Sequence, residues 1–138
     1  MKSDQAEKCI LEVDGEELEG LVNINDYEIQ TDVIDVPGYD RSVPVSNGVR
    51  KIPPITAIYK ITRDSQTLGF LENWFYKKEQ HEVTLRRTDG AGREFHRELW
   101  QSVELAACSP GGYDAAAPSY AKVKVIFLPE EIRPLKAE

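Results

Sequence analysis

The hydrophobic period of this chain changes once, between residues 52 and 81, and that change constrains the fold more than any other feature. From Ile55 to Ile61 apolar and polar residues alternate, which is the two-residue period of a strand with one buried face. From residue 68 the spacing lengthens to three and four residues, which places an apolar stripe on one face of a helix. The residues of this stripe are Leu68, Leu71, Trp74 and Phe75. We therefore expect a strand that leads directly into one helix, which Asp64 or Ser65 caps.

Strand-like alternation dominates the rest of the sequence. A turn at Asp14-Gly15 predicts a hairpin near the amino end, and residues 89–92 predict a second hairpin. Residues 37–48 and 106–119 are rich in turn formers and lack a period, so we expect two long loops there. The segments that we expect to be strands are 8–13, 16–22, 23–36, 55–61, 82–88, 93–105 and 120–128. The prediction is a mainly β fold, a β-sandwich or partly closed β-barrel with one flanking α-helix.

We expect a single domain over residues 1–138. The chain is 41% hydrophobic and 30% charged, which is ordinary for a globular domain of this length. Residues 1–7 are predicted to be an N-terminal arm, and residues 129–138 a polar C-terminal tail that lies on a neighbour or moves freely. The start has no apolar region of a secretion signal and no run approaches a membrane span, so we expect folding in a cytoplasm.

Acidic residues are concentrated near the amino end. Residues 1–36 hold 11 acids and 2 bases, a net charge of −9, while residues 37–138 hold 13 acids and 15 bases, a net of +2, which together give −7. An acidic surface repels phosphate groups, so this distribution argues against a nucleic-acid-binding protein that depends on a basic patch. A solvated acidic face is the plain alternative to any functional interpretation.

No combination of residues in the sequence indicates an active site. His81 and His96 have no Ser, Cys or Asp at a spacing typical of a catalytic triad, so we expect surface or strand positions for both. Cys9 and Cys108 lack CxxC or Cys/His spacing, which argues against zinc and redox motifs and leaves open whether they pair with each other. We expect no enzymatic activity, metal or cofactor. Trp100 is either part of a second core layer or an interface anchor.

Several segments in a fixed order carry a resemblance to a known family. They are Asp14-Gly15, Val33 to Val36, Ser46 to Gly48, Ile55 to Arg63 with the helix stripe, Val83 to Gly90, Leu99 to Val103 and Val123 to Phe127. In this order they resemble the tail tube proteins of contractile-tailed bacteriophages, which belong to a superfamily with the haemolysin-coregulated protein. The resemblance runs from about Ile10 to Leu128. One departure is the loop from Cys108 to Pro118, which is rich in alanine and glycine where the family carries a polar segment.

The resemblance implies a structural virion protein. Six copies would form a ring in which the sheet is completed across the hexamer, and the rings would stack into the inner tube of the tail. The implied partners are the tail sheath, the tape-measure protein, and the baseplate and neck proteins, with assembly in the cytoplasm of the bacterial host. DNA would pass during ejection without specific binding, because an acidic wall repels phosphate. The candidates for the face that lines the lumen are Asp26, Glu28, Gln30 and Asp32.

The same resemblance gives roles to the loops and the cysteines. The candidates for contacts with the next ring are Tyr39, Arg41, Val43 and Tyr113. A virion leaves a reducing cytoplasm for an oxidising medium, and a disulfide formed there would join two subunits, since Cys108 falls in a predicted loop and Cys9 does not.

Three other functions stay open at this point. They are a type VI secretion tube protein, an initiator or terminator ring at one end of a tube, and a small β-barrel binding module. The last of these would need a pocket with convergent polar groups.

Overall fold

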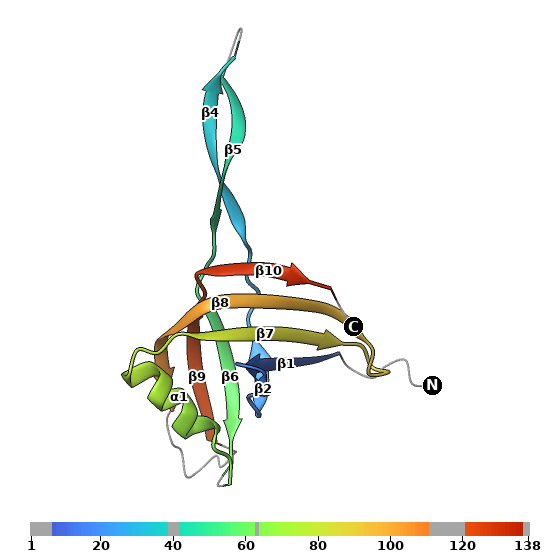
Figure 1. Cartoon of the computed structure of the whole chain (residues 1–138), viewed down its shortest axis with the longest axis vertical. Helices are drawn as coiled ribbons and strands as arrows, with labels where there is room; N and C mark the ends of the chain where they lie inside the picture. The colour runs from blue at the N-terminus through green and yellow to red at the C-terminus, as the bar shows by residue number, and fades with distance from the viewer. Residues whose placement is uncertain (1–6, 39–41, 63, 111–120, 137–138) are drawn as a thin grey trace, which may run out of the picture.

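The computed structural model describes residues 7–38, 42–62, 64–110 and 121–136, and this part of the chain is mainly β with one helix (Figure 1). No helix in the described part is long and apolar enough to cross a membrane. The elements are β1 (Lys8–Val13), β2 (Glu16–Glu17), β3 (Leu21–Ile24), β4 (Gln30–Pro37), β5 (Ser42–Lys51), β6 (Ile55–Ile61), α1 (Thr67–Tyr76), β7 (His81–Thr88), β8 (Glu94–Ser109), β9 (Ala121–Leu128) and β10 (Glu131–Leu135).

The strands of the body follow one antiparallel path in the order β2-β1-β7-β8-β9-β6-β3, and β10 pairs with β8 beside this path. In Figure 1, β1, β7, β10 and the first part of β8 run across the molecule, while β6 and β9 run nearly at right angles to them. Such crossing of strands is typical of two sheets that pack orthogonally around a core. The path has open ends at β2 and β3, so the structure confirms the predicted fold class of a β-sandwich or partly closed barrel with one helix.

Strand β8 belongs to both layers because a bulge bends it. Its first part pairs with β7 and β10, and the residues from Glu104 onward pair with β9. Ser102 has a φ of 52°, and the ladder to β7 shifts by one residue at this point. Trp100 and Val103 are consequently both fully buried although they differ in parity along the strand. Trp100 is therefore a core residue, one of the two alternatives that the sequence left open.

Helix α1 packs its apolar stripe against this core. Leu71 and Trp74 are fully buried, and Leu68 and Phe75 are partly buried against them. The helix begins after Gln66, which provides no side-chain cap, and the hydroxyl of Ser65 instead accepts a hydrogen bond from the N–H of Thr67 at 3.1 Å.

The other end of the helix and the first hairpin turn depend on positive φ angles. Lys78 ends the helical backbone with a φ of 53°. Asp14 and Gly15 have φ angles of 53° and 91°, as a two-residue type I′ turn requires, so the predicted hairpin turn is present.

Several of the expected segments differ from the structure. The extended run 16–22 is interrupted at Gly20, whose φ of 102° separates β2 from β3. Residues 42–48 were expected in a loop but belong to strand β5, which pairs with β4. The β-branched residues on both sides outweigh the turn formers, and Pro44 is tolerated because β5 is an edge strand.

Half of the expected C-terminal tail is also a strand. β10 pairs with β8 from Glu131 to Leu135, and Ile132 is 2% exposed. Its apolar side chain enters the core beside Trp100, its partner in the ladder, and this burial favours the ordered strand over a free tail.

Candidate functional site

The most prominent surface feature is the hairpin of β4 and β5, which forms a two-stranded sheet of its own and projects from the body (Figure 1). Within the described residues, neither strand pairs with any element other than its partner. At the base of the hairpin, Arg50 Nη1 donates a hydrogen bond to the carbonyl oxygen of Ile132 at 3.1 Å and lies 3.6 Å from Glu131 Oε1. The base of the hairpin is thus tied to β10, while the remainder extends away from the core.

The predicted lumen-facing residues lie at this base. Asp26 and Glu28 are exposed in the connection between β3 and β4, and Gln30 is exposed at the first position of β4. Gln30 Nε2 donates a hydrogen bond to Glu28 Oε1 at 3.0 Å. The backbone of Asp32 is in β4, and its side chain lies outside the described residues. The structure therefore brings Glu28 and Gln30 together, although residues 25–29 are not part of the single long strand that the alternation predicted.

The predicted contacts with the next ring fall mainly outside the described residues. Tyr39, Arg41 and Tyr113 are not described, and only the backbone of Val43 is, as part of β5.

The two cysteines are free thiols on different strands. Cys9 lies on β1 opposite Arg87, and Cys108 lies on β8 opposite Val125, so the expectation that Cys108 sits in a loop is wrong. The bulged strand β8 continues past residue 105, where the sequence suggested that it would end. Burial raises the pKa of Cys9 to about 11 and also raises the pKa of Cys108, so both thiols stay protonated near neutral pH.

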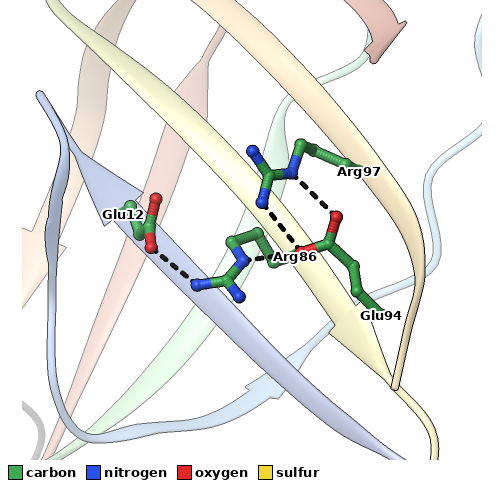
Figure 2. A network of polar contacts seen from close by, with 4 residues as sticks. All are labelled: Glu12, Arg86, Glu94 and Arg97. Carbon is green, nitrogen blue, oxygen red and sulfur yellow. Dashed lines mark hydrogen bonds and ion pairs between the residues drawn. The ribbon is translucent and has the colours of Figure 1, made fainter. Parts of the chain in front are cut away.

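Four charged residues form a network on one face of β1, β7 and β8 that the sequence analysis did not find (Figure 2). Arg86 bridges two carboxylates, with Nη1 at 2.8 Å from Glu12 Oε2 and Nε at 2.9 Å from Glu94 Oε1. Arg97 binds both oxygens of Glu94 at 2.9 Å, and the Glu94 side chain is only 5% exposed. The two carboxylates and the two guanidinium groups neutralise each other here, so the charges on this face are already paired within the subunit.

A second polar cluster lies at the opposite face of β8. Glu98 accepts hydrogen bonds from Tyr27 Oη at 2.6 Å and from Trp100 Nε1 at 3.0 Å, and Glu98 Oε2 lies 2.7 Å from His96 Nε2. Burial raises the pKa of Glu98, but the hydrogen bonds from Trp100, Tyr27 and His96 outweigh burial and lower it overall. Through these contacts, Glu98 on β8 accepts hydrogen bonds that link the connection between β3 and β4 to the buried Trp100.

No arrangement in the described part of the chain resembles a catalytic or metal centre. No group of three or more His, Cys, Asp or Glu residues there has the geometry to hold a metal ion. A pocket of about 450 Å³ lies between the β1–β2 turn and the start of α1, and its charged lining residues are Asp14, Glu16, Glu17, Glu19 and Asp64. Among the described residues, this lining contains no histidine, cysteine or basic residue that would serve as the partner of these carboxylates.

Comparisons with known proteins place this fold among the components of contractile injection systems. No protein-family model and no curated protein sequence matches the chain. Among solved structures, a chain of the cryo-EM structure of the extracellular contractile injection system PVC, with its sheath/tube terminator in the extended state, has a TM-score of 0.74 at 15% identity over 94% of both chains. A chain from the anti-feeding prophage cap, described as the AFP tube terminating cap, has a TM-score of 0.74 at 15% identity over 94% of this chain and 88% of that chain.

The haemolysin-coregulated proteins share the same architecture. Hcp1 from Salmonella typhimurium has a TM-score of 0.64 at 13% identity, over 92% of this chain and 84% of Hcp1. These likenesses cover 94% and 92% of this chain. The chain therefore has the tail tube and Hcp type of fold, as the resemblance in the sequence predicted.

Proposed function

We propose that this chain is a structural subunit whose copies form the rings of a contractile injection tube. The observation that carries the proposal is the hairpin of β4 and β5, which stands apart from the body as a separate two-stranded sheet. A hairpin alone is marginally stable in water, and its two edges expose backbone groups that can pair with another chain. A neighbouring copy in a symmetric ring or stack would supply that surface at a fixed position. The similarity to tube and terminator structures supports the same role.

Shortening the hairpin tests the proposal. Thr31 and Arg50 pair directly in the ladder, so an Asn-Gly turn can replace residues 32–49 between them. We expect a folded monomer, because the buried core residues that the structure describes lie outside the hairpin. We expect no rings or tubes by sedimentation velocity and negative-stain electron microscopy. A matched control replaces the exposed Ala91 by Gly, which keeps the length of the connection between β7 and β8 and should leave assembly intact. Rings formed by the shortened chain would show that the hairpin is not the assembly element.

The version of this function that the sequence favours is the inner tube of a phage tail. Six copies at −7 give −42 per ring, and an acidic wall lets DNA slide without sticking. Asp26 and Glu28 are exposed at the base of the hairpin, where a lining residue must be free of the subunit core. With Asp26→Lys and Glu28→Lys together, tails should assemble but DNA ejection should slow or stall. Normal infectivity of assembled tails would remove these residues from the lumen.

A tube-end ring or a secretion tube is the second candidate. The likenesses to a chain of the PVC sheath/tube terminator structure and to a chain of the AFP cap structure have the same TM-score of 0.74, and Hcp1 follows at 0.64, which supports a tube-end ring and a secretion tube as alternatives. Purified protein that stacks into long filaments would favour a tube, whereas single rings that do not stack would favour a terminator. Neighbouring genes for a sheath and a tape-measure protein would favour the phage tail over a secretion tube.

A further inference from the structure

The side chain of His81 lies between two carboxylates from different parts of the fold. Its Nδ1 is 2.6 Å from Asp14 Oδ2 in the β1–β2 turn, and its Nε2 is 2.8 Å from Glu79 Oε1 in the segment after α1. The imidazole packs edge-on against Trp74, with ring centroids 4.7 Å apart, and also contacts Phe70 at 5.4 Å. The side chain is only 16% exposed. The imidazole ring is thus held by a carboxylate at each nitrogen and by the aromatic rings of α1 on one side.

Only the imidazolium form can donate to both carboxylates at once. A neutral imidazole has one N–H, so its second nitrogen would direct a lone pair at a carboxylate oxygen less than 3 Å away. Asp14 is the better anchored acceptor, because its Oδ1 accepts the N–H of Glu82 at 3.2 Å and its own N–H donates to the carbonyl of Glu82 at 2.9 Å. The Asp14 side chain is the more exposed of the two, at 55% against 37% for Glu79, but the Glu79 carboxylate has no second hydrogen bond of this kind among the described residues, so its contact is the one that loss of the proton releases.

We propose that His81 is a proton-dependent latch that fastens the C-terminal end of α1 to the β1–β2 turn. Glu79 follows the left-handed residue Lys78 that ends the helix, and the N–H of Glu79 donates to the carbonyl of Trp74 at 3.0 Å. Holding the Glu79 carboxylate therefore holds the last turn of α1 against the sheet. The latch belongs to the subunit itself and does not depend on the proposed tube.

The charged surroundings of His81 support the same direction of control. Asp14 and Glu79 are the carboxylates that face it; α1 contributes only the rings of Phe70 and Trp74, and β8 places Val103 opposite it. The next acid along β8, Glu104, accepts a hydrogen bond from Gln80 at 2.8 Å.

The pKa of His81 sets the pH range in which the latch acts. Burial lowers this pKa, but the hydrogen bonds with Glu79 and Asp14 outweigh it and raise the pKa above 6.5. Because the folded pKa is raised, the latch is complete below about pH 6.5 and is lost as the pH rises through the folded pKa.

An NMR titration of the full chain tests the latch, since the protein has only two histidines. We expect the His81 ring to titrate above pH 6.5 and the backbone amides of residues 77–79 to shift with the same midpoint. In Glu79→Gln the midpoint should fall by about one pH unit, because a charged acceptor is lost. In Glu72→Gln, which changes an exposed residue of the same helix, the midpoint should stay where it is.

The wild-type titration decides the proposal even if a variant folds poorly. A His81 midpoint at or below 6.5 would overturn it, as would amides of residues 77–79 that do not follow the histidine. An equal shift in Glu79→Gln and Glu72→Gln would also overturn it, because the effect would then be general charge rather than the contact. A midpoint that falls only in Glu79→Gln supports the latch.

Discussion

Replacing Trp74 shows how much the single helix contributes to the stability of the subunit. The side chain of Trp74 is fully buried, its indole N–H donates to the carbonyl of Val103 at 3.0 Å, and its ring contacts Phe127 at a centroid distance of 5.7 Å. Truncation of a buried Trp to Ala typically costs about 3–5 kcal/mol. The Val103 carbonyl would also lose its partner in the core, which costs about 1–3 kcal/mol more.

The sum is about 4–8 kcal/mol, compared with total stabilities of about 5–15 kcal/mol for domains of this kind. Trp74→Ala is therefore expected to bring the subunit close to unfolding at room temperature. Trp74→Phe keeps an aromatic ring and loses mainly the hydrogen bond and part of the volume, so we expect a loss of about 2–3 kcal/mol. Tyr76→Ala is the matched control on the same helix, because Tyr76 is 74% exposed, and it should change stability by about 0.5 kcal/mol or less.

Urea unfolding followed by far-UV circular dichroism gives these free energies without relying on tryptophan fluorescence. The measurement should be made at a concentration where the protein is monomeric, because assembly would add to the apparent stability. A loss below about 1.5 kcal/mol for Trp74→Ala, with an unchanged denaturant slope, would refute the account of Trp74 as part of the core. An equal loss for Tyr76→Ala would refute it as well, since exposure would then not govern the cost.

Three other predictions follow from single contacts. Glu98→Gln should lower the stability near neutral pH, and the loss should become smaller as the pH falls. Because the pKa of Glu98 is lowered in the folded state, its carboxylate stabilises the fold above about pH 4.5, and this contribution is lost as the pH falls through the folded pKa. An equal loss of stability in thermal melts at pH 7 and pH 3 would contradict this prediction. Gly20→Ala should destabilise more than Gly15→Ala, as both have positive φ but a Cβ at Gly20 would collide with a backbone carbonyl while Gly15 has open space; equal melting temperatures would contradict the clash. If Cys9 and Cys108 join subunits after release, non-reducing denaturing gels of assembled particles should show multimers that collapse with reductant, and monomer in both lanes would exclude the bond.

The parts of the fold that the sequence predicted are those with local signals. Helix α1 was predicted because its stripe has a period of its own, and Leu71 and Trp74 are indeed buried. The turn at Asp14-Gly15 was predicted because few residues adopt two successive positive φ angles at low cost. In both cases the information lies within a few neighbouring residues.

The parts that it missed depend on partners distant in the sequence. Pro44 and Gly48 suggest a loop when β5 is considered alone, and pairing with β4 overrides that suggestion. Similarly, β10 looks polar until Ile132 is placed against Trp100, more than 30 residues away. The bulge at Ser102 switches the buried side chains of β8 from even-numbered to odd-numbered positions, and no residue type in that segment predicts a bulge.

The candidate site shows the same division. The acidic character of residues 23–36 was evident from composition, but their separation into a connection and a strand was not. The network of Glu12, Arg86, Glu94 and Arg97 joins three strands, but Glu94 and Arg97 differ in parity along β8, so alternation alone would place them on opposite faces. The register shift of the β7–β8 ladder between Arg87 and Thr88 lets them meet. Likewise, His81 was expected to be an isolated histidine, and only the return of the chain from α1 into β7 places it between two acids.

The continuity of β8 through both layers has a mechanical consequence. If the proposed tube is driven along its axis, each subunit would experience shear between its two layers of strands. Here a single 16-residue strand is hydrogen-bonded into one layer before its bend and into the other after it. Sliding one layer past the other would have to break the hydrogen bonds between β7 and β8 and those between β8 and β9 at the same time. The subunit should therefore transmit a pushing force as a stiff unit.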